Sequence, residues 1–385
     1  MRMQKSQYKT LIYVSMLGTA LGICREIFLL IVLGISKTND NLQIYLSIAY
    51  NISLLGDAAR LAVLNLLQKF QPREFIVHSF IFYFSLGLLI AITHFILNPG
   101  INIYLLLIST LVGCLNIFVV IFSVCIQYGG NTLIVQKVAL LPNFILLPCL
   151  VVFNQFFKEE IVFLTIIAYL LIPISQINIL KKYFFSTREV PKIKDLKYIY
   201  LQMLPHTPLT FATVIAQIAI RTSLFHLADG YLTIYNFFQK ILDSLRVNFV
   251  ETYIASKIKT WVSSKENYLE KKIIKLNIYF LLIVSIFILL EKNIIKSEIK
   301  LLLVMIIGFC LQMINRIAYV QMNSDFLQKK SMFILYSIIE IVFALLIYLL
   351  INRTEVIFYG YFLWFIVKNF LQILWIKSKR TEVSL

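Results

Sequence analysis

The sequence predicts an all-α polytopic membrane protein with about twelve transmembrane helices, arranged as two six-helix lobes around a central cationic cavity. Three observations support this class. First, 60% of the 385 residues are hydrophobic and the mean hydropathy is +0.84, more apolar surface than a soluble core requires. Second, basic residues concentrate in alternate loops. Third, one pattern of charged residues recurs near half the chain length.

Twelve apolar segments are long enough to cross a bilayer, which takes about 20 helical residues. Each should be a helix, because lipid cannot satisfy the open edge of a strand. Four prolines, Pro142, Pro148, Pro205 and Pro208, are expected to interrupt spans 5 and 7. The predicted spans are 10–34, 43–66, 75–97, 101–126, 132–153, 161–180, 199–223, 229–254, 273–291, 299–321, 332–352 and 356–376.

Basic residues predict the orientation. The two termini and the loops after even-numbered spans hold 21 Lys and Arg, against 5 in the opposite loops. Cytoplasmic loops carry such an excess, so both termini should be cytoplasmic. The same bias accounts for the net charge of +17 without a nucleic-acid partner. The predicted parts are an N-terminal lobe (1–180), a basic cytoplasmic linker (181–198), a C-terminal lobe (199–376) and a cytoplasmic tail (377–385).

The sequence offers no pattern typical of an enzyme. All five cysteines lie in apolar segments without a C-x-x-C motif, and the four histidines lack metal-ligand spacing. We find no phosphate-binding glycine loop, nucleophile elbow or zinc motif. The predicted outer loops are also short, whereas a membrane polymerase usually places catalytic groups on a long one. We therefore expect no catalytic residue, no metal and no cofactor.

Two polar stripes occupy residues 210–251, although this region is apolar enough to cross a membrane twice. The first contains Thr213, Gln217 and Arg221 at helical spacing. The second follows a turn and includes Gln239, Lys240, Asp243 and Arg246. A charge at the centre of a lipid-facing helix costs about 2.5–3.5 kcal/mol, so the stripes should line a water-filled cavity. The alternative is that these side chains lie at helix ends and extend to the headgroups.

An internal duplication is the simplest explanation of the charge pattern. An arginine, an aspartate and an Asp-x-x-Arg pair occur in that order twice: Arg25, Asp40, Asp57 and Arg60, then Arg221, Asp229, Asp243 and Arg246. The offsets are 196, 189 and 186 residues, each close to half the length. Such repeats surround the central site of many transporters.

Charges within the predicted spans are mainly basic, which suits an anionic substrate. The planar fork of arginine binds two phosphate oxygens at once. Asp57 and Asp243 each lie one turn before an arginine and should orient it. The predicted substrate contacts are Arg25, Arg60, Arg221, Arg246, Lys240, Gln217, Thr213 and Gln239. The predicted supporting or coupling acids are Glu26, Asp40, Asp57, Asp229 and Asp243.

Two stretches carry a resemblance to a known family. Residues 21–26 (Leu-Gly-Ile-Cys-Arg-Glu), followed by Leu33-Gly34 and Asp40, resemble the opening of the MurJ/MviN lipid flippases. Residues 220–240 resemble the opening of that family's second half. The family belongs to the multidrug/oligosaccharidyl-lipid/polysaccharide (MOP) exporter superfamily, with the Wzx-type O-antigen flippases. The resemblance covers about the first 70 residues and residues 205–260.

The resemblance implies two lobes in a V around a cationic cavity. It also implies transfer of a polyprenyl-pyrophosphate-linked glycan from the inner to the outer leaflet of the bacterial cytoplasmic membrane. Its partners would be the glycan substrate and membrane lipids, with polysaccharide polymerase and glycosyltransferases as further expected partners.

Three departures favour a surface-polysaccharide unit, such as an O-antigen repeat, over lipid II. Thr19 stands where the lipid II type usually has arginine, Phe237-Phe238 stands where it has Asp-Arg, and we count twelve spans instead of fourteen. The alternatives are a lipid II flippase, an integral-membrane polysaccharide polymerase and a cation-coupled drug exporter, which would prefer an acidic cavity.

Overall fold

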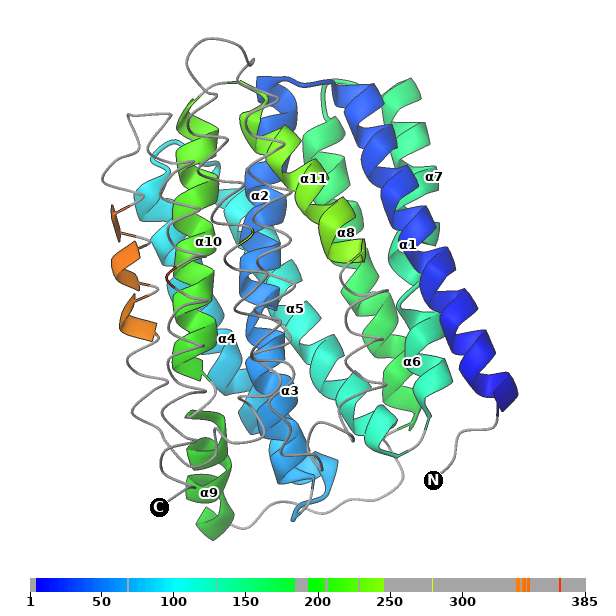
Figure 1. Ribbon diagram of the computed structural model, residues 1–385, viewed down its shortest axis with the longest axis vertical. Helices are drawn as coiled ribbons and strands as arrows, with labels where there is room; N and C mark the ends of the chain where they lie inside the picture. Colours follow the sequence, from blue (N-terminus) through cyan, green and yellow to red (C-terminus); the bar gives the residue numbers. More distant parts are fainter. Residues whose placement is uncertain are drawn as a thin grey trace. The chain divides into compact units, whose positions relative to one another are not determined.

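The computed structural model describes residues 5–67, 69–129, 131–183, 193–204, 207–227 and 229–245, with isolated positions at 279, 337–339, 341–343, 345–346 and 367. Every regular element in this part of the chain is a helix, which confirms the predicted all-α class (Figure 1). The α-helices are α1 (Lys5–Leu33), α2 (Lys37–Ser53), α3 (Leu55–Leu66), α4 (Pro72–Leu97), α5 (Ile103–Tyr128), α6 (Thr132–Val138), α7 (Leu141–Phe156), α8 (Ile161–Leu180), α9 (Ile193–Met203), α10 (Thr207–Leu227) and α11 (Tyr231–Leu245). A short 3-10 helix, η1 (Lys181–Tyr183), follows α8.

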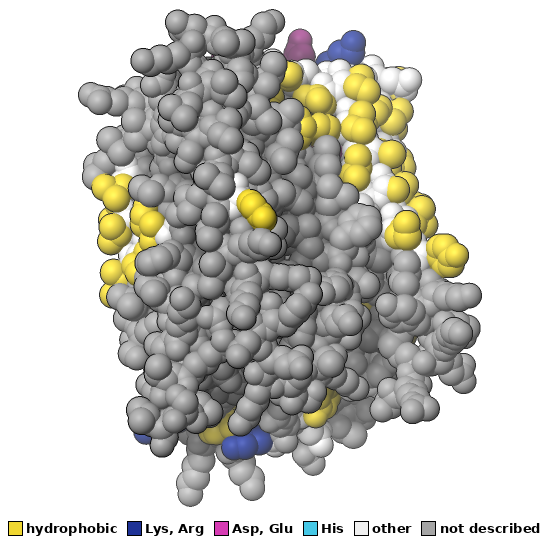
Figure 2. Space-filling model, viewed as in Figure 1, with side chains coloured by type: hydrophobic (Ala, Val, Ile, Leu, Met, Phe, Trp, Pro, Cys, Tyr) yellow, Lys and Arg dark blue, Asp and Glu magenta, His cyan; other side chains and the backbone are white. Residues whose placement is uncertain are grey.

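Five helical stretches are long and apolar enough to cross a membrane, so the protein is a multi-pass membrane protein. They agree with predicted spans 1, 3, 4, 5 and 6: Met16–Leu33, Glu74–Leu97, Ile103–Tyr128, Leu133–Phe156 and Ile161–Tyr183. In Figure 2 the exposed side of α1 is covered by hydrophobic side chains, drawn in yellow. The charged side chains that are coloured in this view lie near its top and bottom. Its exposed hydrophobic residues include Tyr13, Met16, Leu17, Ile27 and Ile31.

Three predicted spans are interrupted. Span 2 divides into α2 and α3 at Leu54, next to Ser53, whose hydroxyl donates to the Tyr50 carbonyl at 2.7 Å. Such back-bonding often bends helices. Span 5 divides into α6 and α7, and Pro142 occupies the first turn of α7, where its missing N–H costs least. Span 7 divides into α9 and α10. The expectation for Pro148 was wrong, because it lies inside α7 without ending it.

Small residues allow α2, α4 and α5 to pack closely at the centre of the described helices. A Cβ atom at Gly113 of α5 would lie 2.6 Å from the Ile52 Cβ atom and 2.8 Å from the Ala49 carbonyl oxygen, both on α2. A Cβ atom at Gly87 of α4 would lie 2.9 Å from the Cys114 Sγ atom. Membrane helices use small residues in this way, because close backbone approach increases packing.

The chain forms two compact units, residues 1–233 with 333–345 and residues 234–332 with 346–385. Helix α10 belongs to the first unit, where it packs against α2, α3 and α4 (Figure 1). Most of the predicted second lobe lies outside the described residues. The division into lobes at 1–180 and 199–376 therefore stays a prediction.

Candidate functional site

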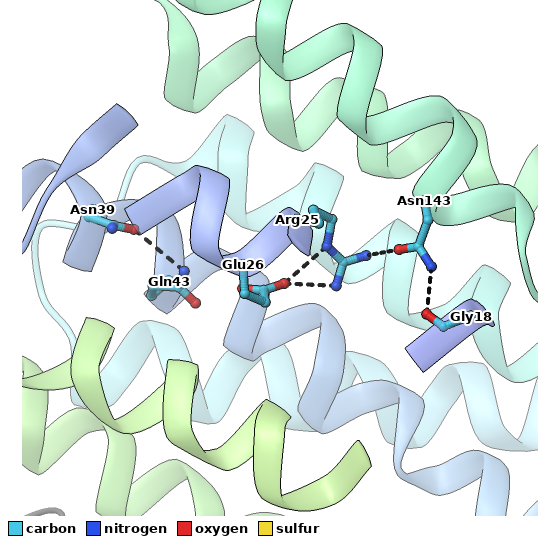
Figure 3. A network of polar contacts seen from close by, with 6 residues as sticks. All are labelled: Gly18, Arg25, Glu26, Asn39, Gln43 and Asn143. Carbon is cyan, nitrogen blue, oxygen red and sulfur yellow. Dashed lines mark hydrogen bonds and ion pairs between the residues drawn. The ribbon is translucent and has the colours of Figure 1, made fainter. Parts of the chain in front are cut away.

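Arg25 forms the centre of a polar cluster on α1, within a membrane-spanning stretch (Figure 3). Its Nε and Nη2 atoms donate to Glu26 Oε1 at 3.0 and 2.7 Å. Its Nη1 atom donates to Asn143 Oδ1 on α7 at 3.3 Å, and the guanidinium lies 5.8 Å from the Tyr169 ring centroid. Glu26 is buried, whereas the Arg25 side chain is 15% exposed. Glu26 and Asn143 thus fix the position of the Arg25 guanidinium, which remains slightly exposed.

Asn143 ties this cluster to the backbone. Its Nδ2 atom donates to the Gly18 carbonyl oxygen on α1 at 3.1 Å, while its Oδ1 atom accepts from Arg25 (Figure 3). The described bonds use three of the five N–H donors that a guanidinium carries. Two donors therefore stay available to an anion. Asn143 was not among the predicted site residues, and its only signal in the sequence is an amide in the first turn of an otherwise apolar stretch of α7.

Asp40 fastens the start of α2 to the start of α11. Its Oδ2 atom accepts from the Gly230 N–H, and its Oδ1 atom accepts from the Thr233 N–H at 2.8 Å and the Thr233 hydroxyl at 2.7 Å. Gly230 is the residue before α11 and has no side chain to cap it. The buried Asp40 carboxylate supplies that cap from another helix, at the positive end of the helix dipole. We call these three residues the Asp40 latch.

A weaker contact lies beside the latch. Lys37 Nζ is 3.8 Å from Asp229 Oδ1, and both side chains are largely exposed. Lys37 also donates to the Phe225 carbonyl oxygen at 3.2 Å. Exposed ion pairs contribute little, so of the two predicted acids in this region Asp40 is the structurally important one.

Arg221 is the centre of a second, buried cluster that joins α10 to α2 and α4. It is 3% exposed, donates to Asn51 Oδ1 and lies over the Tyr50 ring at 4.7 Å from its centroid. Asn51 Nδ2 is 3.1 Å from His94 Nε2. Asn98, the residue that follows α4, donates from its Nδ2 atom to Thr222 Oγ1 at 3.1 Å. The sequence predicted the arginine but not its polar partners, although Asn51 continues a series of buried polar residues on α2 at steps of four, Asn39, Gln43 and Ser47.

The other predicted site residues have varied surroundings. Gln217 is buried, Thr213, Gln239 and Lys240 are partly buried, and Asp57 and Arg60 are exposed on α3. Among the described contacts, Asp57 and Arg60 form no ion pair with each other, and none joins the Arg25 cluster to the Arg221 cluster. Asp243 lies on α11, and Arg246 lies outside the described residues.

The turns after the two arginine helices correspond. Gly34 follows α1 with φ of 66°, and Gly230 precedes α11 with φ of 87°, a region that only glycine enters easily. Each glycine comes nine residues after Arg25 or Arg221, so their offset is again 196 residues. The predicted sequence repeat therefore gains one further matching position, at which the positive φ explains why both residues are glycine.

These helices define an all-α polytopic protein with the fold of the MATE and MurJ transporters. No protein-family model and no curated protein matches the sequence. Among solved structures, a lipid II flippase MurJ in an inward closed conformation matches with a TM-score of 0.60 and 14% identity, covering 97% of this chain and 87% of that chain.

Two further matches are multidrug transporters. An inward-facing MATE family transporter of the MOP superfamily matches with a TM-score of 0.55 and 13% identity, covering 97% of this chain and 95% of that one. The MATE multidrug transporter DinF-BH matches with a TM-score of 0.54 and 14% identity, covering 98% and 96%. At such identities the likeness shows the fold alone. These structural neighbours are transporters and a flippase.

Proposed function

We propose that the protein is a flippase that moves a polyprenyl-pyrophosphate-linked oligosaccharide from the inner to the outer leaflet of the bacterial cytoplasmic membrane. The observation that carries this proposal is Arg25, held inside a membrane span by Glu26 and Asn143 with two donors left over. The fold shared with a lipid II flippase supports the same class of activity.

The substrate group suited to Arg25 is the pyrophosphate. A guanidinium within a membrane is costly to keep, and such groups usually serve an ion or substrate pathway. Glu26 offsets the charge while the pathway is empty. Two remaining N–H groups can form charge-assisted bonds with phosphate oxygens, which are among the stronger hydrogen bonds in proteins. The sugars would then contact Thr213 and Gln217, and the lipid tail would remain in the bilayer.

We propose that the Asp40 latch acts as a gate on the substrate pathway. Asp40 belongs to the first predicted lobe, whereas Gly230 and Thr233 belong to the second. With the predicted orientation, the latch lies at the outer end and closes it, so that the substrate enters from the cytoplasmic side. Separation of the latch would then open the outer side and release the glycan there.

Two other cargoes are represented among the similar folds. Lipid II is the cargo named for MurJ, and the MATE proteins are named as multidrug transporters. The departures at Thr19 and at Phe237-Phe238 favour a different glycan from lipid II. The two free donors of Arg25 favour an anion over a cationic drug.

Reconstitution into liposomes tests the proposal. Three cargoes are compared: a fluorescent polyprenyl-pyrophosphate oligosaccharide, lipid II and a cationic dye. We expect the first to cross fastest, measured as fluorescence that becomes accessible to an impermeant quencher. Faster movement of lipid II would reassign the substrate, and movement of the dye alone would reject the flippase.

A further inference from the structure

We propose that His94 is a proton-binding site, and that a proton on its ring releases α10 from α2 and α4. The inference rests on the proposed function only in that this release would form part of a transport cycle. It follows from the order of donors and acceptors in the chain Arg221, Asn51, His94.

The hydrogen bonds fix the state of the ring. Arginine can only donate, so the Asn51 atom that faces Arg221 must be the oxygen, as observed. The amide nitrogen of Asn51 therefore faces His94 Nε2, at 3.1 Å. Because that nitrogen donates, Nε2 must accept and cannot carry a proton. In the packed arrangement His94 is therefore neutral, with its hydrogen on Nδ1.

A second proton is incompatible with this arrangement. It would have to bind at Nε2, where it would meet an N–H group of Asn51 in place of a lone pair. It would also add a positive charge to a fully buried ring beside the Arg221 guanidinium. The first effect opposes the contact of Asn51 with His94, and Arg221 on α10 enforces that contact by fixing the orientation of the Asn51 amide. The second effect opposes the contact between α10 and α4. The proton can bind favourably only after α10 moves away and water reaches the ring.

The Nδ1 side of the ring also favours release. Within the described part of the chain, His94 Nδ1 and Asn98 Oδ1 are buried and have no hydrogen-bond partner. An N–H buried without an acceptor is unfavourable, and solvent would satisfy it once the helices separate. The hydrogen bonds of Arg221 and Thr222 thus stabilise the packing of α10, while the unsatisfied Nδ1–H group of His94 destabilises it.

Several helices that pack against α4 carry charged or titratable groups. Among the described residues, Arg221 is the charged group that lies close to His94. From α2 the facing residue is the neutral Asn51. On α3, Asp57 and Arg60 are exposed. On α5, Tyr104 is exposed, and Cys114 lies beside Gly87, two turns from His94. Helix α9 meets the other end of α4, where Tyr200 contacts His78 and Phe82.

Linkage gives the size of the effect. An imidazole in water has an ordinary pKa of about 6.5, whereas the packed state excludes the proton. The packed state, in which α10 contacts α2 and α4, therefore keeps its full stability above that pH. Its stability relative to the separated state falls as the pH drops below that value. Between pH 7.5 and 5.5 the ratio of packed to separated molecules should fall about tenfold.

The distance between spin labels tests this in the full-length protein in liposomes, without substrate. The background replaces the five native cysteines, and labels are attached after Thr38→Cys on α2 and His226→Cys on α10, both exposed positions. We expect a longer distance to gain population at pH 5.5, by about tenfold relative to pH 7.5. In His94→Gln the response to pH should vanish. The matched control His78→Gln, on the same helix but outside the cluster, should respond like the parent.

A second variant keeps the test sharp if His94→Gln folds poorly. Asn51→Asp provides a carboxylate that accepts from both Arg221 and a protonated His94, so acid should no longer separate the helices. An unresponsive parent, or a response that survives in His94→Gln or Asn51→Asp, would overturn the inference. Because these distances are measured without glycan, neither result decides whether the protein is a flippase.

Discussion

Replacing Asp40 by asparagine should loosen the latch without removing its bulk. In the parent, both carboxylate oxygens accept: one from the Gly230 N–H, the other from the Thr233 N–H and hydroxyl. The asparagine side chain would keep one oxygen and lose the negative charge. Its NH₂ group would then face one of the backbone N–H groups at the start of α11.

The structure gives the magnitude. A hydrogen bond to a charged group contributes about 1.5–3 kcal/mol, and a charge at a helix terminus up to about 2 kcal/mol in a partly buried setting. These terms overlap, because the same carboxylate makes both. We expect Asp40→Asn to destabilise the closed latch by about 2–3 kcal/mol, which is roughly a 30- to 150-fold change in the ratio of closed to open molecules.

Cysteine accessibility measures this ratio. Ser223→Cys on α10 is nearly isosteric at a fully buried position, one turn before the end of the helix. In a background without native cysteines, its rate of modification by an impermeant maleimide reports opening. We expect Asp40→Asn to raise that rate by roughly the same 30- to 150-fold.

Asp229→Asn is the matched control, because Asp229 carries the same charge beside the latch but makes only an exposed contact at 3.8 Å. Its loss should change the rate less than about fivefold, corresponding to under 1 kcal/mol. Equal effects of the two substitutions, or no effect of Asp40→Asn, would refute the assignment of Asp40 as the cap that fastens α11.

Three further predictions follow from the described contacts. Gly230→Ala should lower the melting temperature more than Gly34→Ala, because both have positive φ but only a Cβ atom at Gly230 would overlap the Ile35 side chain; thermal unfolding in detergent would show equal losses if this packing is wrong. Asn143→Ala should reduce flipping while retaining the protein in the membrane, since Arg25 loses its fixed position; unchanged flipping in liposomes would show that Asn143 does not position it. An impermeant thiol reagent applied to whole cells should label a cysteine at His226 and spare one at Lys192, and the reverse would invert the predicted orientation.

The sequence was informative where one physical constraint dominates. Hydropathy predicted the five described spans, because the bilayer sets the length of an apolar helix. Helical spacing predicted that Gln217 and Arg221 share a face, and both are buried on α10. Gly34 and Gly230 share the offset of 196 residues and both have positive φ, while the repeat of whole lobes stays a prediction.

Tertiary partners could not be predicted in this way. Asn51 ends a stripe of buried polar residues on α2 at steps of four (Asn39, Gln43 and Ser47), but this spacing does not identify the partners of the stripe. Asn143 has no polar residue three or four positions away in α7. Their roles depend on which helices pack together, and the sequence does not specify that packing. The Asp40 latch joins residues 190 and 193 positions apart, a contact that the charge pattern did not indicate.

The most direct test of the proposed flippase is the effect of Arg25 substitutions on glycan movement in liposomes. Arg25→Ala removes the donors offered to the pyrophosphate, and charge-assisted bonds of about 1.5–3 kcal/mol predict a rate lower by roughly tenfold to 150-fold. Arg25→Lys should recover only part of the rate, because a point charge lacks the two-pronged contact. Flipping of the polyprenyl-pyrophosphate oligosaccharide at the parental rate by Arg25→Ala, reconstituted at a normal level, would contradict the account.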